Sequence, residues 1–221
     1  SNMVSRLGVL RGMFDPVHKG HVRAAKFARQ LLSLDIVKMI PCHIPNHRNL
    51  AVSNTKHRSN MLRLAIESDR GLEVDDIESD NDDVSYTLET LRSLQARKPS
   101  SSMILILGMD SFNSLPEWFK WEELFSLCSF CVLPRANLKI DKGTYGKLDL
   151  ERRLVSSVTE FYEERAGKVI VAENFYCESS SSEIRSELDS DYCVTSNLDE
   201  KVWSYIKKHD LYKENDLGNS H

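Results

Sequence analysis

His18 and His21 stand three residues apart, where a short apolar run has ended and a helix is expected to begin. That spacing places both imidazoles on one side of the helix start, where each can donate a hydrogen bond to a phosphate oxygen. Gly12 directly follows the apolar run and lets the backbone approach a ligand closely, and the helix start offers free N–H groups and a positive dipole end. Donors aimed where charge develops stabilise a transition state more than a ground state. We therefore predict a phosphate-binding loop over residues 12–21, with His18 and His21 as its catalytic residues.

Two other phosphate-binding patterns and one structural role compete with this interpretation. The loop lacks the GxxxxGKS/T spacing of a P-loop and the glycine spacing of a dinucleotide-binding fingerprint. An isolated histidine pair would more often cap a helix and pack against a sheet. Because Asp15, Pro16 and Gly20 accompany the pair, we favour the functional interpretation.

The elements that must position these residues alternate between short apolar runs and longer amphipathic segments. This alternation is typical of a parallel sheet covered by helices, so we predict an α/β fold. Strands are expected at residues 7–10, 36–40, 103–107, 130–133 and 169–172. Helices are expected at residues 20–34, 56–68, 86–96, 150–165, 183–188 and 199–209. We expect the segment 135–167, which contains the charged helix 150–165, to be peripheral.

Length and composition restrict the kind of molecule. With 221 residues we expect one domain over residues 3–212, a helical subregion at about 181–212 and a disordered tail at 213–221. The 41% of hydrophobic and 28% of charged residues indicate a globular chain. A formal charge of −4 provides no broad positive surface for nucleic acid, and no apolar stretch has the length of a membrane span. We therefore expect a cytoplasmic protein with small-molecule partners, and the oligomeric state stays open.

The five cysteines are odd in number and form no dense disulfide framework, which favours reduced thiols. Cys128 and Cys131 make a CxxC inside an apolar stretch, without a second Cys or His pair at metal-binding spacing. We predict that they are buried structural residues.

Two short stretches resemble signatures of the nucleotidylyltransferase superfamily. GMFDPVHKGH at residues 12–21 resembles GxFDPxHxGH, and SSSEIR at residues 180–185 resembles (I)SSTxIR. The resemblance implies a Rossmann-like doubly wound parallel sheet and adenylyl transfer from ATP. It also implies that Arg185 is a third catalytic residue, besides His18 and His21, and that it neutralises the departing pyrophosphate. The implied ATP-binding residues are Gly12, Met13, Phe14, Asp15, His18, His21, Gly108, Asp110, Ser180, Ser182 and Arg185. In isolation, the second stretch would instead indicate a serine-capped helix with a surface arginine.

Three further stretches are similar to bacterial nicotinate-nucleotide adenylyltransferases, so the matches together cover residues 8–212. PCHIPNHR at residues 41–48 resembles a loop that meets the mononucleotide phosphate, and SYT at residues 85–87 resembles an element whose backbone meets the nicotinate carboxylate. GMDS at residues 108–111, with WF at 118–119, resembles a segment whose tryptophan stacks on the pyridine ring. The implied pyridine-nucleotide-binding residues are His47, Arg48, Ser85, Tyr86, Thr87, Trp118 and Phe119. The resemblance implies nicotinate mononucleotide as the acceptor, and Mg²⁺ held mainly by the ATP phosphates without a protein metal site.

Some positions depart from the family patterns. Arg11 replaces a common glycine, Met13 a serine or threonine, Asn46 a proline, Phe119 a tyrosine and Ser182 a threonine.

Two other functions stay open. The first is adenylyl or cytidylyl transfer to another phosphorylated acceptor such as phosphopantetheine, and the second is a non-catalytic nucleotide-sensing module. The choice between nicotinate and nicotinamide mononucleotide also stays open, because backbone N–H groups, which any residue supplies, would make it.

Overall fold

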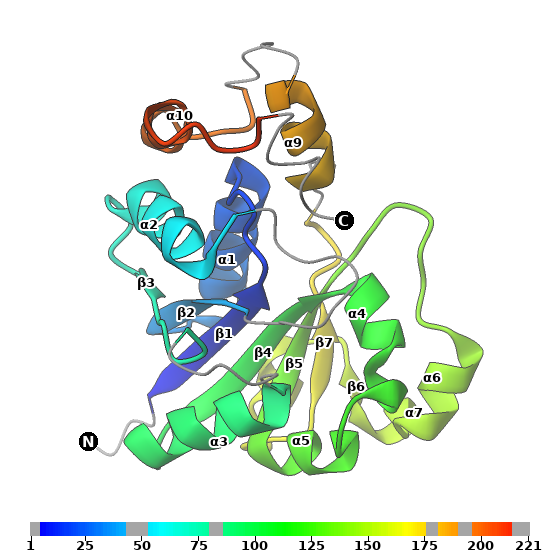
Figure 1. The fold of residues 1–221 in the computed structure, drawn as a ribbon. Helices are drawn as coiled ribbons and strands as arrows, with labels where there is room; N and C mark the ends of the chain where they lie inside the picture. The colour runs from blue at the N-terminus through cyan, green and yellow to red at the C-terminus, as the bar shows by residue number, and fades with distance from the viewer. Residues whose placement is uncertain (1–4, 43–52, 80–85, 176–180, 190–195, 214–221) are drawn as a thin grey trace. The chain divides into compact units, whose positions relative to one another are not determined.

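The computed structural model describes residues 5–42, 53–79, 86–175, 181–189 and 196–213 (Figure 1). The central feature is a seven-stranded sheet with the strand order β3-β2-β1-β4-β5-β7-β6. The strands are β1 (Arg6–Gly12), β2 (Ile36–Pro41), β3 (Leu72–Val74), β4 (Ser102–Gly108), β5 (Cys128–Leu133), β6 (Leu154–Val155) and β7 (Val169–Val171). The β1–β4, β4–β5, β5–β7 and β6–β7 pairs are parallel. The predicted α/β fold is confirmed, and the five predicted strands coincide with β1, β2, β4, β5 and β7.

The strand order reverses at β1. The chain leaves β1 towards β2 and β3, and it returns as β4 on the other side of β1. In open parallel sheets, ligands bind outside the carboxyl ends of the strands at such a reversal. β4 is buried from its first residue to Leu107 and becomes exposed only at Gly108, its last residue. Thus β4 is buried on both faces, as its apolar run predicts, and it ends at the surface.

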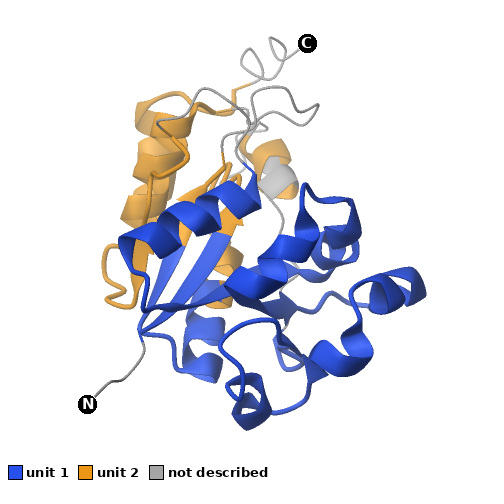
Figure 2. Cartoon of the chain, turned by 90° about the horizontal axis from the view of Figure 1, so that it is seen from below, with its two compact units in different colours: residues 1–10, 25–38, 86–176 blue, residues 11–24, 39–85, 177–221 orange. Residues whose placement is uncertain are grey.

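The chain divides into two compact units, which Figure 2 shows in different colours. Unit 1 comprises residues 1–10, 25–38 and 86–176, and unit 2 comprises residues 11–24, 39–85 and 177–221. β1, β2 and the helix α1 (Lys19–Leu32) each contribute residues to both units. The expectation of a single domain over residues 3–212 stays a prediction.

Unit 1 contains the strand-rich core and most of the short helices. The helices are α3 (Thr87–Arg97), α4 (Met109–Asn113), η1 (Leu115–Glu117), α5 (Trp121–Leu127), α6 (Lys142–Lys147), α7 (Leu150–Arg153) and α8 (Val158–Phe161). The ring of Phe130 on β5 lies 4.7 Å from the ring of Phe125 and 6.2 Å from that of Phe112, centroid to centroid. Cys128 and Cys131 are buried free thiols, and burial raises the pKa of Cys131 to about 12. This confirms the prediction that they are buried, and it explains why their thiols stay protonated.

The predicted helix over residues 150–165 is wrong. The expectation that segment 135–167 is peripheral agrees with the strand order, because β6, which lies in this segment, is the edge strand of the sheet. The structure divides residues 150–165 into α7, the strand β6 and α8, because Leu154 and Val155 pair with Val169 and Ile170 of β7. Leu150 and Phe161 are at most 1% exposed. A strand of two residues is too short to show a periodic pattern of its own within a charged sequence that favours a helix, and its pairing with β7 is a tertiary contact.

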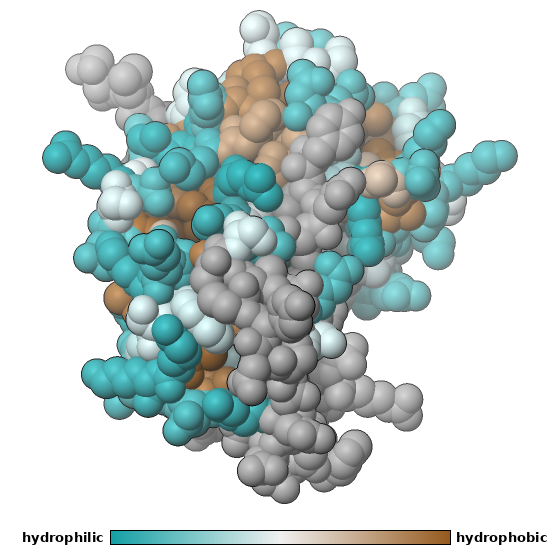
Figure 3. All heavy atoms as spheres, turned by 90° about the horizontal axis from the view of Figure 1, so that it is seen from above, coloured by the Kyte–Doolittle hydropathy of each residue, from teal (hydrophilic) through white to brown (hydrophobic). Residues whose placement is uncertain are grey.

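Unit 2 contains the remaining helices, α2 (Thr55–Ile66), α9 (Ser181–Asp189) and α10 (Glu200–Lys208). α10 packs against α2, where the hydroxyl of Tyr205 lies 2.7 Å from Nδ1 of His57 and accepts a hydrogen bond from Asn60. None of the helices that the structure describes is long and apolar enough to cross a membrane. The surface drawn in Figure 3 carries mostly hydrophilic side chains, with hydrophobic residues in small patches between them.

Candidate active site

The loop over residues 12–21 follows β1 and leads into α1. Phe14 in this loop has a positive φ of 49° and is 2% exposed. A Cβ atom at position 12 would lie 3.2 Å from the Phe14 ring, so any side chain there would displace the ring. The Phe14 ring in turn stands edge-on to the imidazole of His21, with centroids 5.0 Å apart. Gly12 therefore makes room for an aromatic ring that supports one of the two predicted catalytic histidines.

The structure brings His18 and His21 together as a stacked pair. Their ring centroids are 3.7 Å apart and the rings are inclined by 26°. The backbone N–H of Gly20 donates to Nδ1 of His18 at 3.0 Å, and the backbone N–H of His18 donates to Nδ1 of His21 at 3.1 Å. A neutral imidazole whose Nδ1 accepts a hydrogen bond carries its proton on Nε2. Both rings therefore hold an Nε2–H donor for a ligand.

The electrostatic surroundings keep both rings neutral. Burial, with a smaller contribution from the charge of Arg23, lowers the pKa of His18 to about 4. Burial also lowers the pKa of His21 well below its ordinary value, and neighbouring His18 acts in the same direction. At neutral pH the pair therefore offers two uncharged N–H donors, and a bound phosphate meets hydrogen bonds here without a change of protonation.

The expected free N–H groups at the start of α1 are not found, and this part of the sequence interpretation is wrong. The N–H of Lys19 donates to the carbonyl of Asn197 at 2.9 Å, and that of Gly20 is taken by His18. The N–H groups of His21 and Val22 donate to the carbonyl of His18 at 3.1 and 3.4 Å. In this structure, the groups at the helix start that can turn to a phosphate are the imidazoles, because the first amides already donate to backbone carbonyls or, at Gly20, to Nδ1 of His18.

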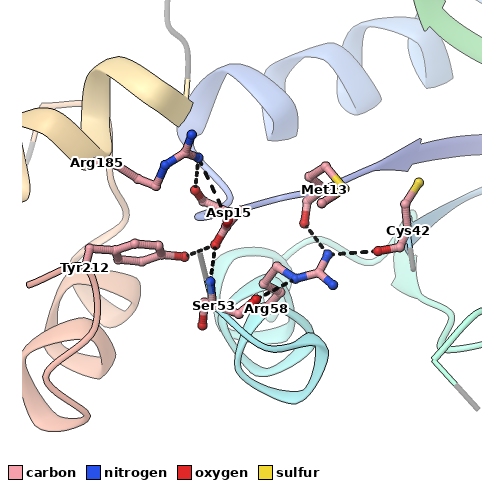
Figure 4. Close-up of polar contacts among 7 residues, drawn as sticks. All are labelled: Met13, Asp15, Cys42, Ser53, Arg58, Arg185 and Tyr212. Carbon is pink, nitrogen blue, oxygen red and sulfur yellow. Dashed lines mark hydrogen bonds and ion pairs between the residues drawn. The ribbon is translucent and has the colours of Figure 1, made fainter. Parts of the chain in front are cut away.

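Asp15 is the point where the two signature segments meet (Figure 4). Arg185 on α9 donates from Nη1 to the backbone carbonyl of Asp15 at 2.5 Å, and the same atom lies 4.0 Å from Oδ2. Oδ1 of Asp15 accepts hydrogen bonds from the Tyr212 hydroxyl at 2.5 Å and from the Ser53 N–H at 3.2 Å. Burial and the Asp15 charge raise the pKa of Tyr212, so its hydroxyl stays protonated and donates. The predicted catalytic residue Arg185 is thus placed beside the histidine loop.

Arg58, in the first turns of α2, is 3% exposed and was missed by the sequence interpretation. Its Nη1 donates to the carbonyls of Met13 at 2.8 Å and Cys42 at 3.0 Å (Figure 4). Its Nε donates to the carbonyl of Ser53 at 3.1 Å. One signal could have found it: an arginine three residues before Met61 falls on the buried face of the predicted helix, where an unpaired charge is too costly.

In unit 1, Gly108 and Asp110 lie where β4 ends and α4 begins. A Cβ atom at Gly108 would meet no atom within 4 Å, so the strand end is open. Asp110 forms an ion pair with Arg135, and both side chains are more than half exposed. An exposed pair of this kind is weak, so either partner can exchange it for a ligand at little cost.

The two elements predicted to meet the pyridine ring come together in unit 1. The rings of Tyr86 and Phe119 lie 4.7 Å apart, centroid to centroid, and both side chains are more than 40% exposed. Thr87, the first residue of α3, is 8% exposed. Trp118 is half-buried, and its Nε1 donates to the Ser114 hydroxyl at 3.1 Å. The aromatic face on the surface is therefore formed by Tyr86 and Phe119, with Trp118 held beside them.

Several predicted site residues lie outside the described residues. These are His47, Arg48, Ser85 and Ser180, while Ser182 lies in α9 with its side chain outside the description. Arg11, which departs from the family pattern, forms a bidentate pair with Glu78, Nε to Oε2 at 2.5 Å and Nη2 to Oε1 at 2.8 Å. Met13, the second departure in the loop, presents its backbone carbonyl to Arg58.

Comparison with known proteins gives consistent matches over nearly the whole chain. The model of the cytidylyltransferase-like family matches residues 9–187. A protein of Pseudoalteromonas atlantica named probable nicotinate-nucleotide adenylyltransferase is 38% identical over 213 residues, which cover 96% of this chain and 97% of that protein. A protein of Shewanella frigidimarina with the same name is 32% identical over 212 residues, covering 94% of this chain and 100% of its own. These matches confirm the resemblance that the motifs indicate.

Solved structures agree on the fold. The Plasmodium falciparum nicotinic acid mononucleotide adenylyltransferase complexed with NaAD has a TM-score of 0.71 at 20% identity, over 94% of this chain and 97% of that one. The same Plasmodium falciparum protein complexed with APC gives a TM-score of 0.70 at 18% identity, with the same coverage. The predicted nucleotidylyltransferase type of sheet is thereby confirmed.

Proposed function

Since the chain belongs to the nicotinate-nucleotide adenylyltransferases of the cytidylyltransferase-like family, we propose that it transfers the adenylyl group of ATP to nicotinate mononucleotide. The products are deamido-NAD and pyrophosphate, a step of NAD biosynthesis. The observation that carries the proposal most directly is the meeting of the two signature segments within unit 2. His18 and His21 stand in one loop, and Arg185 reaches the same loop from α9 through Asp15.

The reaction is a direct in-line displacement. A 5′-phosphate oxygen of nicotinate mononucleotide forms a bond to the α-phosphorus of ATP, and the bond from that phosphorus to the bridging oxygen of the β-phosphate breaks. Negative charge accumulates on the pyrophosphate that leaves. The Nε2–H groups of His18 and His21 donate to the triphosphate oxygens, and the Arg185 guanidinium offsets the leaving charge. The protein supplies position and charge stabilisation, and no covalent protein intermediate is required.

The remaining roles follow the family resemblance. We assign Gly12, Met13, Phe14, Asp15, Gly108, Asp110, Ser180 and Ser182 to ATP, and His47, Arg48, Ser85, Tyr86, Thr87, Trp118 and Phe119 to the mononucleotide. Within the first set, the Asp15 carboxylate accepts hydrogen bonds from Ser53 and Tyr212, which supports a role in shaping the loop. Within the second set, the exposed rings of Tyr86 and Phe119 support an aromatic surface for a flat heterocycle.

Mg²⁺ belongs to this proposal as part of the nucleotide substrate. The described residues hold no group of three or more His, Cys, Asp or Glu side chains that could bind a metal ion. We propose that the ATP phosphates supply most of the oxygen ligands of Mg²⁺, in line with its preference for phosphate and water. We also propose a cytoplasmic location, since ATP is a substrate.

The test is a pyrophosphate-release assay with ATP and a panel of acceptors. We expect kcat/KM for nicotinate mononucleotide to exceed that for phosphopantetheine and simple phosphoalcohols by at least about 100-fold, because the site is built for a flat ring. CTP in place of ATP tests the cytidylyl alternative in the same assay. Release that is faster with another acceptor, or with CTP, would contradict the proposed substrates. ATP binding without release across the panel would indicate a nucleotide-sensing module.

A further inference from the structure

The guanidinium of Arg58 connects three segments of unit 2 that are distant in sequence. It makes four hydrogen bonds, to the carbonyls of Met13, Cys42 and Ser53 and to the Thr55 hydroxyl, with lengths between 2.8 and 3.1 Å. A guanidinium presents its donors in a rigid planar fork, so the directions of the three carbonyls are fixed together.

The burial of Arg58 makes this network rigid. The residue is 3% exposed, and Ser53 and Asp15 beside it are 5% and 2% exposed. Ser53 is held on two sides, because its carbonyl accepts from Arg58 while its N–H donates to Asp15. A buried charge is tolerated only when it is hydrogen-bonded and compensated, and the Asp15 carboxylate is the nearby opposite charge. Removing the fork would leave three backbone carbonyls to find new donors.

Each of the three carbonyls lies in or directly beside a segment with a proposed role. Met13 lies in the loop over residues 12–21, where the backbone N–H groups of Gly20 and His18 orient the imidazoles of His18 and His21. Cys42 and Ser53 border residues 43–52, which include His47 and Arg48, the proposed contacts of the mononucleotide phosphate. The Arg58 guanidinium therefore joins the backbone of the loop over residues 12–21, here called the ATP loop, with the backbone on both sides of residues 43–52, here called the acceptor segment.

We propose that Arg58 is a positioning residue for adenylyl transfer: it sets the backbone of the ATP loop relative to both ends of the acceptor segment. This inference rests on the proposed function. The side chain itself is enclosed by protein, and its hydrogen bonds go to protein atoms. Its effect passes through Met13, Cys42 and Ser53, so a change in its geometry should weaken the use of both substrates together.

The variant Arg58→Lys tests this, because it keeps the charge but replaces the planar fork by a single ammonium group. The matched control is Arg63→Lys on the same helix, where the arginine side chain is 49% exposed and pairs with Asp76 at the surface. We expect Arg58→Lys to lower kcat/KM for ATP and for nicotinate mononucleotide by about 10- to 100-fold, as displaced binding groups do. Arg63→Lys should stay within about twofold of the wild type. Both are measured at a temperature where circular dichroism shows the variants folded.

A merely structural role would lower the Tm of Arg58→Lys and leave both kinetic constants unchanged, and that result would overturn the proposal. Thr55→Val removes only one of the four hydrogen bonds and should give a smaller fall for the same two substrates. Titration of ATP alone separates this proposal from the proposed function. If the wild type binds ATP but does not react with nicotinate mononucleotide, the acceptor is wrong, and Arg58 is judged on ATP affinity. A Kd for ATP in Arg58→Lys equal to that of the wild type would then overturn the positioning role.

Discussion

At the scale of single residues, the hydrogen bonds at Nδ1 determine what His18 and His21 can do. Each Nδ1 accepts a backbone N–H, so each neutral ring can donate only from Nε2. Both donors can be aimed at the oxygens on which charge grows, and their orientation is set before any ligand binds. This is the condition under which hydrogen bonds lower a barrier most.

Removing one of these donors should affect turnover more than binding. We expect His21→Ala to lower kcat by about 10²- to 10³-fold, the cost usually found for one donor aimed at a transition-state oxygen. The measurement is steady-state pyrophosphate release with ATP and nicotinate mononucleotide. His209→Ala, a histidine at the end of α10 in the same unit, is the control and should keep kcat within about twofold. Near-full turnover of His21→Ala would remove it from the catalytic set.

The low pKa of His18 also predicts a pH dependence of stability. The pKa is about 4 in the folded protein and 6.5 in an ordinary environment, so the unfolded chain binds the proton more readily between these values. The free energy of unfolding should therefore fall as the pH falls below 6.5, by about 1.4 kcal/mol per pH unit once this histidine titrates in the unfolded chain. Urea denaturation at pH 7, 6 and 5 measures it. His18→Gln should show a smaller slope over the same range, and an equal slope would contradict the assigned burial.

The sequence could indicate candidate residues for the charge chemistry, but it could not indicate the residues that hold these candidates in place. His18, His21 and Arg185 stand in recognisable motifs, and the structure brings all three to one loop. Arg58 and Tyr212 stand in no motif that we recognised, and their partners are backbone carbonyls and a carboxylate distant in sequence. Such contacts depend on the tertiary fold, so a single sequence contains no local signal for the pairing.

At the scale of elements, the end of β1 shows how a departure from the family pattern is compensated. Arg11 stands where a glycine is common, and Glu78, 2% exposed, receives two hydrogen bonds from its guanidinium. The arginine thus has a buried partner of opposite charge, 67 residues further along the chain. The side chain of Arg11 is thereby directed to Glu78.

Replacing Arg11 by the common glycine should therefore destabilise the protein. Arg11→Gly takes away both hydrogen bonds from a buried carboxylate, a change that typically costs about 3–5 kcal/mol. Chemical denaturation of the wild type, Arg11→Gly and the double variant Arg11→Gly/Glu78→Gln measures this. The double variant should regain part of the loss, because the neutral amide is cheaper to bury. A loss below about 1 kcal/mol in the single variant would show that the pair contributes little.

The elements themselves were predicted where the pattern is long and were missed where it is short. The periodicity of residues 20–34 and the apolar run at 103–107 predicted α1 and β4 within about two residues of the observed bounds. The charged pattern at 150–165 predicted one helix, and pairing with β7 divides it. β3, β6 and the five-residue α4 are too short for a periodic signal, and their places are decided by their neighbours in the fold.

At the scale of the whole molecule, the two compact units share three elements, and we expect them to unfold together. Trp118 and Trp121 belong to unit 1 and Trp203 to unit 2, so fluorescence can report on each separately. Trp203→Phe leaves the reporters of unit 1, and the double variant Trp118→Phe/Trp121→Phe leaves that of unit 2. In each variant, the urea midpoint measured by tryptophan fluorescence should equal the midpoint measured by far-UV circular dichroism. Two separate transitions within one variant would contradict the single domain predicted over residues 3–212.

The central claim is that the α-phosphate of ATP passes with its adenosine to nicotinate mononucleotide. The most direct measurement uses ATP radiolabelled in the α-phosphate, with nicotinate or nicotinamide mononucleotide as acceptor, and separates the products by chromatography. With nicotinate mononucleotide, the account predicts that the label enters deamido-NAD, with one pyrophosphate released for each dinucleotide formed, and that this transfer is faster than the transfer to nicotinamide mononucleotide, which would give labelled NAD. It also predicts that His21→Ala loses this transfer. Label that stays in ATP, or that appears in free AMP or ADP without a dinucleotide, would contradict it.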